Sequence, residues 1–186
     1  MRREQFDHLL RAASAIVGDD RLTVIGSQAI LGSFDDSELP AVLVLSQEVD
    51  LIPLGDSQGK RDLIDGTIGE FSQFHETFGV WAHGVAEATG VLPAGWRDRL
   101  VSYSSARTPG VVALCLEVHD LWVAKAMRSD PRDVAYCQAL AGWGRLSPSV
   151  IADRLAATPA APERLALARA LAGTSFGTTQ PWSPDY

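Results

Sequence analysis

Two acidic residues interrupt an otherwise apolar segment near residue 50. Glu48 and Asp50 are separated by one residue in SQEVDLIP. On a β-strand, residues two apart point to the same face, so both carboxylates project together while Val49 and Leu51 face the core. Neighbouring carboxylates repel each other unless a positive charge lies between them, and Mg²⁺ or Mn²⁺ binds such oxygen atoms. The pair predicts a divalent-metal site, with a solvated acidic strand edge as the alternative.

A second feature is the turn where a short β-branched run ends. In TVIGSQAILGSF, the strand-like residues break at Gly26 and Ser27, and the pattern then becomes helical. Such a turn places backbone N–H groups and a hydroxyl at the start of a helix, where they can bind a phosphate anion. The alternative is that Ser27 only caps the helix, and on these two residues alone that alternative is the stronger.

A lysine lies within an apolar helical segment. Lysine is rare in this arginine-rich chain, and Lys125 lies among apolar residues in LEVHDLWVAKAMRSDPRD, with Asp133 eight residues further on. A lysine in this setting can neutralise a phosphate or a developing charge. It can equally extend its stem along an apolar surface and leave its ammonium group in water. The segment by itself leaves both interpretations open.

The elements that position these residues follow from the spacing of apolar side chains. A helix is predicted over residues 6–17, and a weaker one over 56–71. Residues 41–45 fit either a strand or a helical turn. The predicted strands are 21–26, 48–53, 78–85, 99–105 and 110–116. The later helices are 118–129, 131–142, one that begins at Ser147-Pro148, and 161–172.

Strands and helices alternate first, and helices alone follow. We therefore expect an α+β protein with an α/β core over 1–116, a helical C-terminal subdomain over 117–175 and a loose tail over 176–186. The chain of 186 residues is too short for two full domains.

Composition narrows the function classes. A net charge of −7 argues against a protein that coats nucleic acid, because phosphate neutralisation requires clustered basic residues. No apolar run approaches the roughly 18 residues of a membrane span, and no signal-peptide pattern is visible. We expect a cytoplasmic protein with no membrane partner. The motifs of zinc proteases, P-loop proteins and α/β-hydrolases are absent from the sequence.

The cysteines and histidines give no chemical signal of their own. Cys115 and Cys137 have no metal-type spacing, and we expect free, buried thiols. The four histidines form no ligand-spaced pair, so we expect ordinary packed or exposed side chains at His8, His75, His83 and His119.

Three segments taken together, VIGSQAILG, LSQEVDLIP and CLEVHDLWVAKAMRSDPRD, resemble small prokaryotic nucleotidyltransferase-fold proteins related to the AbiEii and MenT toxins, within the DNA polymerase beta superfamily. The stretch HETFGVWAHGVAEATGVLPAGWRDRLVSYSSARTPG also looks like that family's region between the metal strand and the C-terminal helices. The resemblance covers roughly residues 20–140. It implies a minimal nucleotidyltransferase core, a mixed sheet with helices, before the helical half.

The resemblance also implies roles for the residues described above. Gly26 and Ser27 would hold a nucleoside triphosphate, and Ser46 would line the same pocket. Glu48 and Asp50 would hold Mg²⁺ or Mn²⁺ and act as catalytic residues, with Glu48 in a position where the family more often has Asp.

Further positions of the family's active site fall in the second half of the chain. Lys125 and Asp133 match two of them. The superfamily usually has a third metal carboxylate, which the sequence does not assign; Glu87 and Glu117 are candidates.

The implied activity is the transfer of a nucleoside monophosphate from a nucleoside triphosphate to an acceptor hydroxyl. The acceptor would be RNA, with a tRNA 3′ end as the first candidate, approached through Arg97, Arg99, Arg107 and the basic residues of 125–132. The biological context would be the toxin of a toxin–antitoxin or phage-defence pair, with a cognate antitoxin as partner. The alternatives are a binding module of the same fold without turnover, and transfer to a protein or a small molecule.

Overall fold

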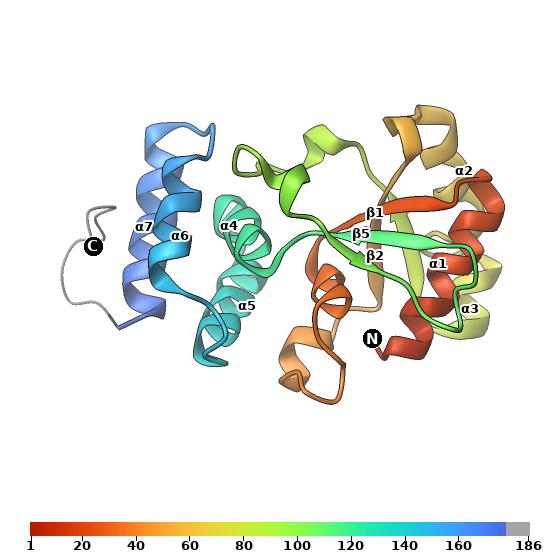
Figure 1. Cartoon of the computed structure of the whole chain (residues 1–186), viewed down its shortest axis with the longest axis horizontal. Helices are drawn as coiled ribbons and strands as arrows, with labels where there is room; N and C mark the ends of the chain where they lie inside the picture. Colours follow the sequence, from red (N-terminus) through yellow and green to blue (C-terminus); the bar gives the residue numbers. More distant parts are fainter. Residues whose placement is uncertain (178–186) are drawn as a thin grey trace. The chain divides into compact units, whose positions relative to one another are not determined.

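A five-stranded mixed sheet forms the first part of the molecule (Figure 1). The computed structural model describes residues 1–177. The strands are β1 (Arg21–Ile25), β2 (Glu48–Pro53), β3 (Trp81–Gly84), β4 (Val101–Tyr103) and β5 (Val112–Cys115). Their order across the sheet is β3-β2-β1-β5-β4. β1 pairs antiparallel with β2 and parallel with β5, while β2 and β3 are parallel and β4 and β5 antiparallel.

Helices follow the sheet, as the sequence pattern predicts. The helices of the first part are α1 (Arg3–Val17), α2 (Gln58–Ile68) and α3 (Gln73–Phe78). The later helices are α4 (Val118–Arg128), α5 (Pro131–Gly142), α6 (Pro148–Ala156) and α7 (Pro162–Ser175). Short 3₁₀ helices are η1 (Ser27–Gly32), η2 (Ala41–Val44), η3 (Leu54–Asp56), η4 (Glu87–Thr89) and η5 (Trp96–Arg99). The prediction of an α+β fold with a helical C-terminal half is confirmed.

The chain forms two compact units, and their boundary differs from the expected one. The sheet unit comprises Met1–Thr89 and Leu100–Leu116, and the helical unit comprises Gly90–Arg99 and the chain from Glu117 onward. Residues 90–99, expected in the core, belong to the helical unit because Arg99 Nε donates to Asp120 Oδ2 at 2.8 Å and Ala94 N donates to Ala157 O at 2.9 Å. These pairings join positions that are distant in the sequence.

One face of the sheet unit is covered by helix α2. A Cβ atom at Gly84 would overlap the backbone of Arg61 in α2, so only glycine permits this close packing of β3 against the helix. Ala82 points to the same side as Gly84 and is fully buried. Trp81 and His83 alternate with them and therefore point to the opposite face, which α2 does not cover.

Two elements differ from the sequence prediction, and a third, which the sequence left open between strand and helical turn, is helical. Residues 27–32 form a 3₁₀ helix, and residues 41–44 take the helical alternative. Helix α3 was not expected, although the sequence has a serine and a glycine where a helix of this length would begin and end. Ser72 Oγ accepts a hydrogen bond from His75 N at 3.1 Å, and Gly79 ends the helix in the left-handed region.

The two cysteines are free and buried, as predicted. Burial raises the pKa of the Cys115 thiol to about 12, so it stays protonated at neutral pH. None of the helices within residues 1–177 is long and apolar enough to cross a membrane. Of the expected tail, residues 178–186 lie outside the described part of the chain.

Candidate metal centre

The sheet face opposite α2 carries four polar or aromatic side chains from two neighbouring strands. In the parallel pairing of β2 with β3, Glu48 lies opposite Trp81 and Asp50 lies opposite His83. The intervening residues Val49, Leu51 and Ala82 are fully buried, so alternation turns the four polar or aromatic side chains to the same outer face. The strands thus place two carboxylates and one imidazole next to each other.

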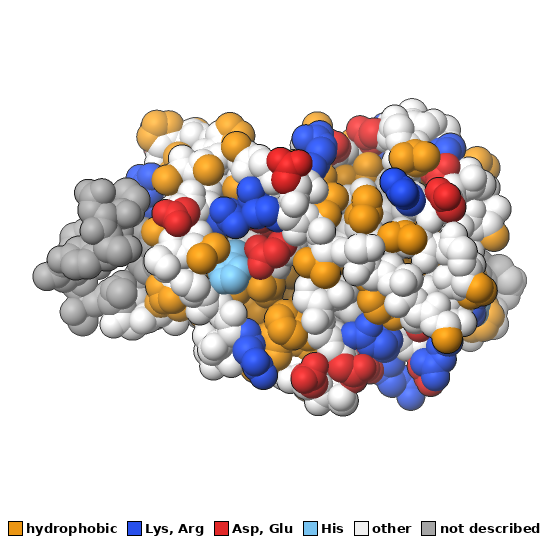
Figure 2. Space-filling view, viewed as in Figure 1, with side chains coloured by type: hydrophobic (Ala, Val, Ile, Leu, Met, Phe, Trp, Pro, Cys, Tyr) orange, Lys and Arg blue, Asp and Glu red, His pale blue; other side chains and the backbone are white. Residues whose placement is uncertain are grey.

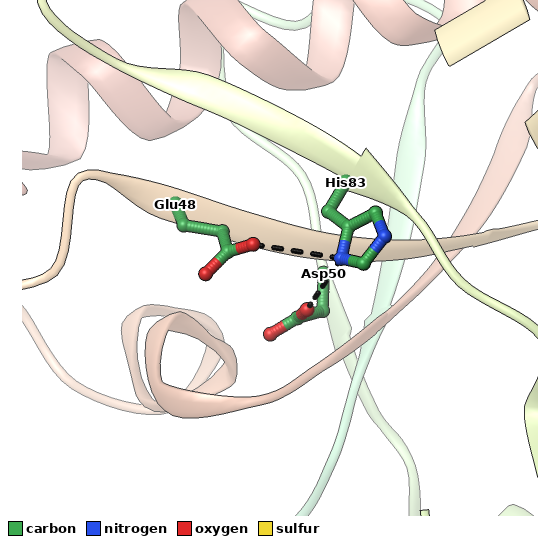
Figure 3. Close-up of side chains that lie close together, drawn as sticks. All are labelled: Glu48, Asp50 and His83. Atoms are coloured by element: carbon green, nitrogen blue, oxygen red, sulfur yellow. Dashed lines mark ion pairs between the residues drawn. The ribbon is translucent and has the colours of Figure 1, made fainter. Parts of the chain in front are cut away.

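Figure 3 shows the three polar side chains converging. His83 Nδ1 lies 3.5 Å from Glu48 Oε1 and 3.8 Å from Asp50 Oδ1. One ligand atom from each residue lies within 4.8 Å of the other two. The side chains of His83, Glu48 and Asp50 are 51%, 38% and 23% exposed, so solvent reaches the cluster.

This arrangement fits a divalent ion. Two atoms bound about 2.1 Å from one ion lie roughly 3.0 to 4.2 Å apart, depending on the angle at the ion. Both distances from His83 Nδ1 fall within this range. Carboxylate oxygens and an imidazole nitrogen are also established types of metal ligand. Glu48, Asp50 and His83 could therefore hold one ion and leave positions open for water or substrate.

The Gly26–Ser27 turn lies directly beside this cluster. Ile25 pairs with Asp50 in the antiparallel register of β1 and β2, and Gly26 follows at the end of the strand. Gly26 has φ 74° and ψ −172°, a conformation that is essentially restricted to glycine. A Cβ atom here would overlap the Asp50 carboxylate. The turn therefore needs glycine for two reasons: other residues rarely adopt this backbone conformation, and the Asp50 carboxylate fills the space that a side chain at residue 26 would take.

The element after the turn is short. Ser27 begins η1, a 3₁₀ helix of six residues that ends at Gly32, where the sequence pattern turns into a loop. A helix of this length contributes little dipole to phosphate binding. Any phosphate contact at Gly26 and Ser27 would therefore depend on local N–H groups and the hydroxyl.

Ser46 has a structural contact of its own. Its Oγ accepts a hydrogen bond from Glu48 N at 3.1 Å. The hydroxyl therefore fixes the chain where β2 begins and orients the first acidic residue, instead of projecting freely into a pocket.

Lys125 and Asp133 lie together, in the helical unit. Lys125 Nζ donates to Asp133 Oδ1 at 2.6 Å, with side chains only 13% and 7% exposed. Arg128 Nε lies 3.0 Å from the other carboxylate oxygen, and the Lys125 ammonium lies 5.1 Å from the centre of the Tyr136 ring. The sequence singled out both residues, and the structure pairs them in a nearly buried ion pair.

Neither candidate for a third carboxylate is a member of the cluster. Glu117 caps α4, where its carboxylate accepts from His119 N at 3.0 Å and lies 2.7 Å from His119 Nδ1. Burial opposes ionisation of Glu117, but these contacts outweigh it and lower its pKa. Glu87 lies in η4 and is not part of the cluster. The third position beside Glu48 and Asp50 is occupied by His83.

A hollow of about 280 Å³ opens on the β3 side of the cluster. It shares two residues with the cluster and is lined by Glu48, Asp65, Gly69, Glu70, Trp81, Ala82 and His83. The His75 ring packs against Trp81 at a tilt of 44°, with centroids 4.4 Å apart, and supports this aromatic wall.

Sequence reasoning missed His83. Its ring nitrogen reaches the acids only because β3 pairs with β2 in a particular parallel register, which a single sequence does not reveal. One signal was present: in VWAHGV, His83 alternates with small buried residues as Asp50 does in β2. An exposed histidine at the centre of a short apolar strand could have been considered as a ligand.

Comparisons with protein families, with curated proteins and with solved structures find no match to this chain. The resemblance to nucleotidyltransferase-fold proteins therefore stays a prediction, and the geometry of the cluster is the basis for any functional proposal.

Proposed function

We propose that this protein is a metal-dependent nucleotidyltransferase that moves a nucleoside monophosphate from a nucleoside triphosphate to an acceptor hydroxyl. One observation carries the proposal: the Glu48 and Asp50 carboxylates and the His83 imidazole converge on one sheet face, and Asp50 lies against the Gly26 turn. A divalent-cation centre beside a glycine turn is an arrangement that can support phosphoryl transfer.

Each residue of the cluster has a defined task in this proposal. Glu48, Asp50 and His83 would hold Mg²⁺ or Mn²⁺, which would neutralise charge on the α-phosphate and orient the attacking hydroxyl. Gly26 and Ser27 would contact the β- and γ-phosphates. The acceptor oxygen forms a bond to the α-phosphorus, the bond to the pyrophosphate oxygen breaks, and the hydroxyl proton passes to solvent water at the exposed cluster.

The first acceptor in the proposal is the one that the resemblance implies, an RNA 3′ end, with the toxin role that accompanies it. Arg128 and Arg132 support it, because their side chains are 67% and 96% exposed. Arg99 does not, because Asp120 binds its guanidinium group. Figure 2 shows basic and acidic side chains interspersed over the visible face. RNA contacts would therefore be few and sensitive to salt.

A second acceptor class, a small hydroxyl compound, is favoured by the hollow beside His83. In phosphoryl transfer the attacking and leaving oxygens lie roughly in line through the phosphorus. If pyrophosphate leaves on the Gly26 side, the acceptor enters from the β3 side, where the hollow opens. Its Trp81 ring and its Asp65 and Glu70 carboxylates suit a neutral or cationic molecule better than a polyanion.

The test is a transfer assay with the full chain. Each of the four α-³²P-labelled nucleoside triphosphates is incubated with Mn²⁺ or Mg²⁺ and with either a tRNA fraction or a panel of hydroxyl-bearing amines. We expect labelled product, with an equal amount of pyrophosphate, either in the reactions with the tRNA fraction or in those with the hydroxyl-bearing amines. Metal-dependent triphosphate binding by calorimetry without any turnover would instead identify a binding module, and no triphosphate binding would overturn the proposal.

A further inference from the structure

We propose that His83 makes this centre prefer a divalent first-row transition-metal ion, with Mn²⁺ as the probe, over Mg²⁺. The inference rests on the proposed function in one respect only, that Glu48, Asp50 and His83 hold a metal ion. It concerns which ion the protein binds, and it does not depend on whether transfer occurs.

The position of the imidazole is fixed by the sheet. His83 lies opposite Asp50 in the β2–β3 register, and its Nδ1 atom faces both carboxylates. The neighbouring residues Ala82 and Gly84 are packed inward, and Gly84 has no room for a Cβ atom against α2. The strand therefore cannot slip to present a different residue, and the third donor beside the acids is nitrogen.

A nitrogen donor changes which ions the site prefers. Mg²⁺ is a hard cation that takes oxygen ligands, demands a near-ideal octahedron and keeps several waters. Imidazole is a better ligand for first-row transition ions, whereas carboxylate suits Mg²⁺ and Mn²⁺ alike. Mn²⁺ shares the carboxylate ligands of Mg²⁺ but is a first-row transition ion, so exchanging an oxygen for the His83 nitrogen strengthens Mn²⁺ binding relative to Mg²⁺.

A simpler explanation of the cluster is an ion pair without metal. A protonated His83 would lie within 4.0 Å of both carboxylates and offset one of their two negative charges. This arrangement makes a different prediction, because a metal-free ion pair gives no nitrogen coupling to a bound ion and no dependence of ion preference on residue 83.

The experiment uses the full chain, freed of metal by chelation and without nucleotide. Mn²⁺ binding is measured by electron paramagnetic resonance, with Mg²⁺ as competitor, and pulsed measurements detect ¹⁴N coupling to the bound ion. His83→Asp restores an all-carboxylate set, and His83→Gln removes the ligand nitrogen. His75→Gln is the matched control, because this imidazole packs against Trp81 but is not part of the cluster.

We expect wild type and His75→Gln to bind Mn²⁺ at least about tenfold more tightly than Mg²⁺, with ¹⁴N coupling. His83→Asp should lose the coupling and most of the preference, and His83→Gln should lose the coupling and Mn²⁺ affinity. An unchanged preference in His83→Asp, or Mn²⁺ bound without ¹⁴N coupling in wild type, would overturn the inference. Selective Mn²⁺ binding with no nucleotidyl transfer would leave it standing and would refute only the proposed function.

Discussion

Replacing Gly26 with alanine is the sharpest test of how the turn and the metal centre depend on each other. Gly26 has φ 74° and ψ −172°, which costs a residue with a side chain about 1–3 kcal/mol. The new methyl group would also overlap the Asp50 carboxylate and force it to move. We therefore expect a loss of about 1–3 kcal/mol in the free energy of unfolding, and a fall of at least about tenfold in Mn²⁺ affinity, since one of three ligands is displaced.

Gly55→Ala is the matched control. Gly55 also has a positive φ of 76°, but a Cβ atom there meets nothing within 4 Å. We expect this variant to lose about 1 kcal/mol of stability through backbone strain and to keep wild-type Mn²⁺ affinity. Urea unfolding and Mn²⁺ titration measure both quantities for both variants. If Gly26→Ala bound Mn²⁺ like wild type, Asp50 would not be a ligand held in place by the turn.

Three further predictions concern charged residues. Without metal, Asp50→Asn should melt at or above the wild-type temperature in calorimetry, because it relieves repulsion between neighbouring carboxylates, while its Mn²⁺ affinity falls at least about tenfold; a strongly lowered melting temperature would make the acid structural. Lys125→Met deprives the nearly buried Asp133 carboxylate of its ammonium partner and should lower the free energy of unfolding, measured in urea, by about 1–3 kcal/mol. Adding Asp133→Asn to the same chain should restore most of this loss, and no restoration would contradict the pairing. Arg99→Glu sets a second negative charge against the fully buried Asp120 and should cost about 3 kcal/mol or more by the same measurement; a near-neutral effect would show that this ion pair does not hold residues 90–99 in the helical unit.

Local patterns were enough to predict much of the fold. Alternation in β2 set Glu48 and Asp50 on one face, and the Gly26–Ser27 break ended β1 where it was expected. The four later helices begin within about two residues of their predicted starts, because Pro131, Pro148 and their preceding polar residues mark helix N-termini independently of tertiary contacts.

The features that were missed depend on contacts between distant residues. His83 joins the acids through a strand pairing across more than thirty positions, and residues 90–99 join the helical unit through Arg99 and Asp120. Nothing in the local sequence distinguishes an Arg99 available to RNA from one bound to a buried carboxylate. The hydrogen bond from Glu48 N to Ser46 Oγ is likewise a contact that the sequence did not reveal.

The proposed function requires that Glu48, Asp50 and His83 hold a metal ion on which a nucleoside triphosphate binds beside Gly26 and Ser27. A crystal structure of the full chain with Mn²⁺ and a non-hydrolysable nucleoside triphosphate analogue tests it most directly, because anomalous scattering locates the ion. We expect an anomalous peak bonded to the two carboxylates and to His83 Nδ1, with the triphosphate bridging from that ion to the Gly26–Ser27 turn. A peak at any other group of residues, or a triphosphate bound away from this turn, would contradict it.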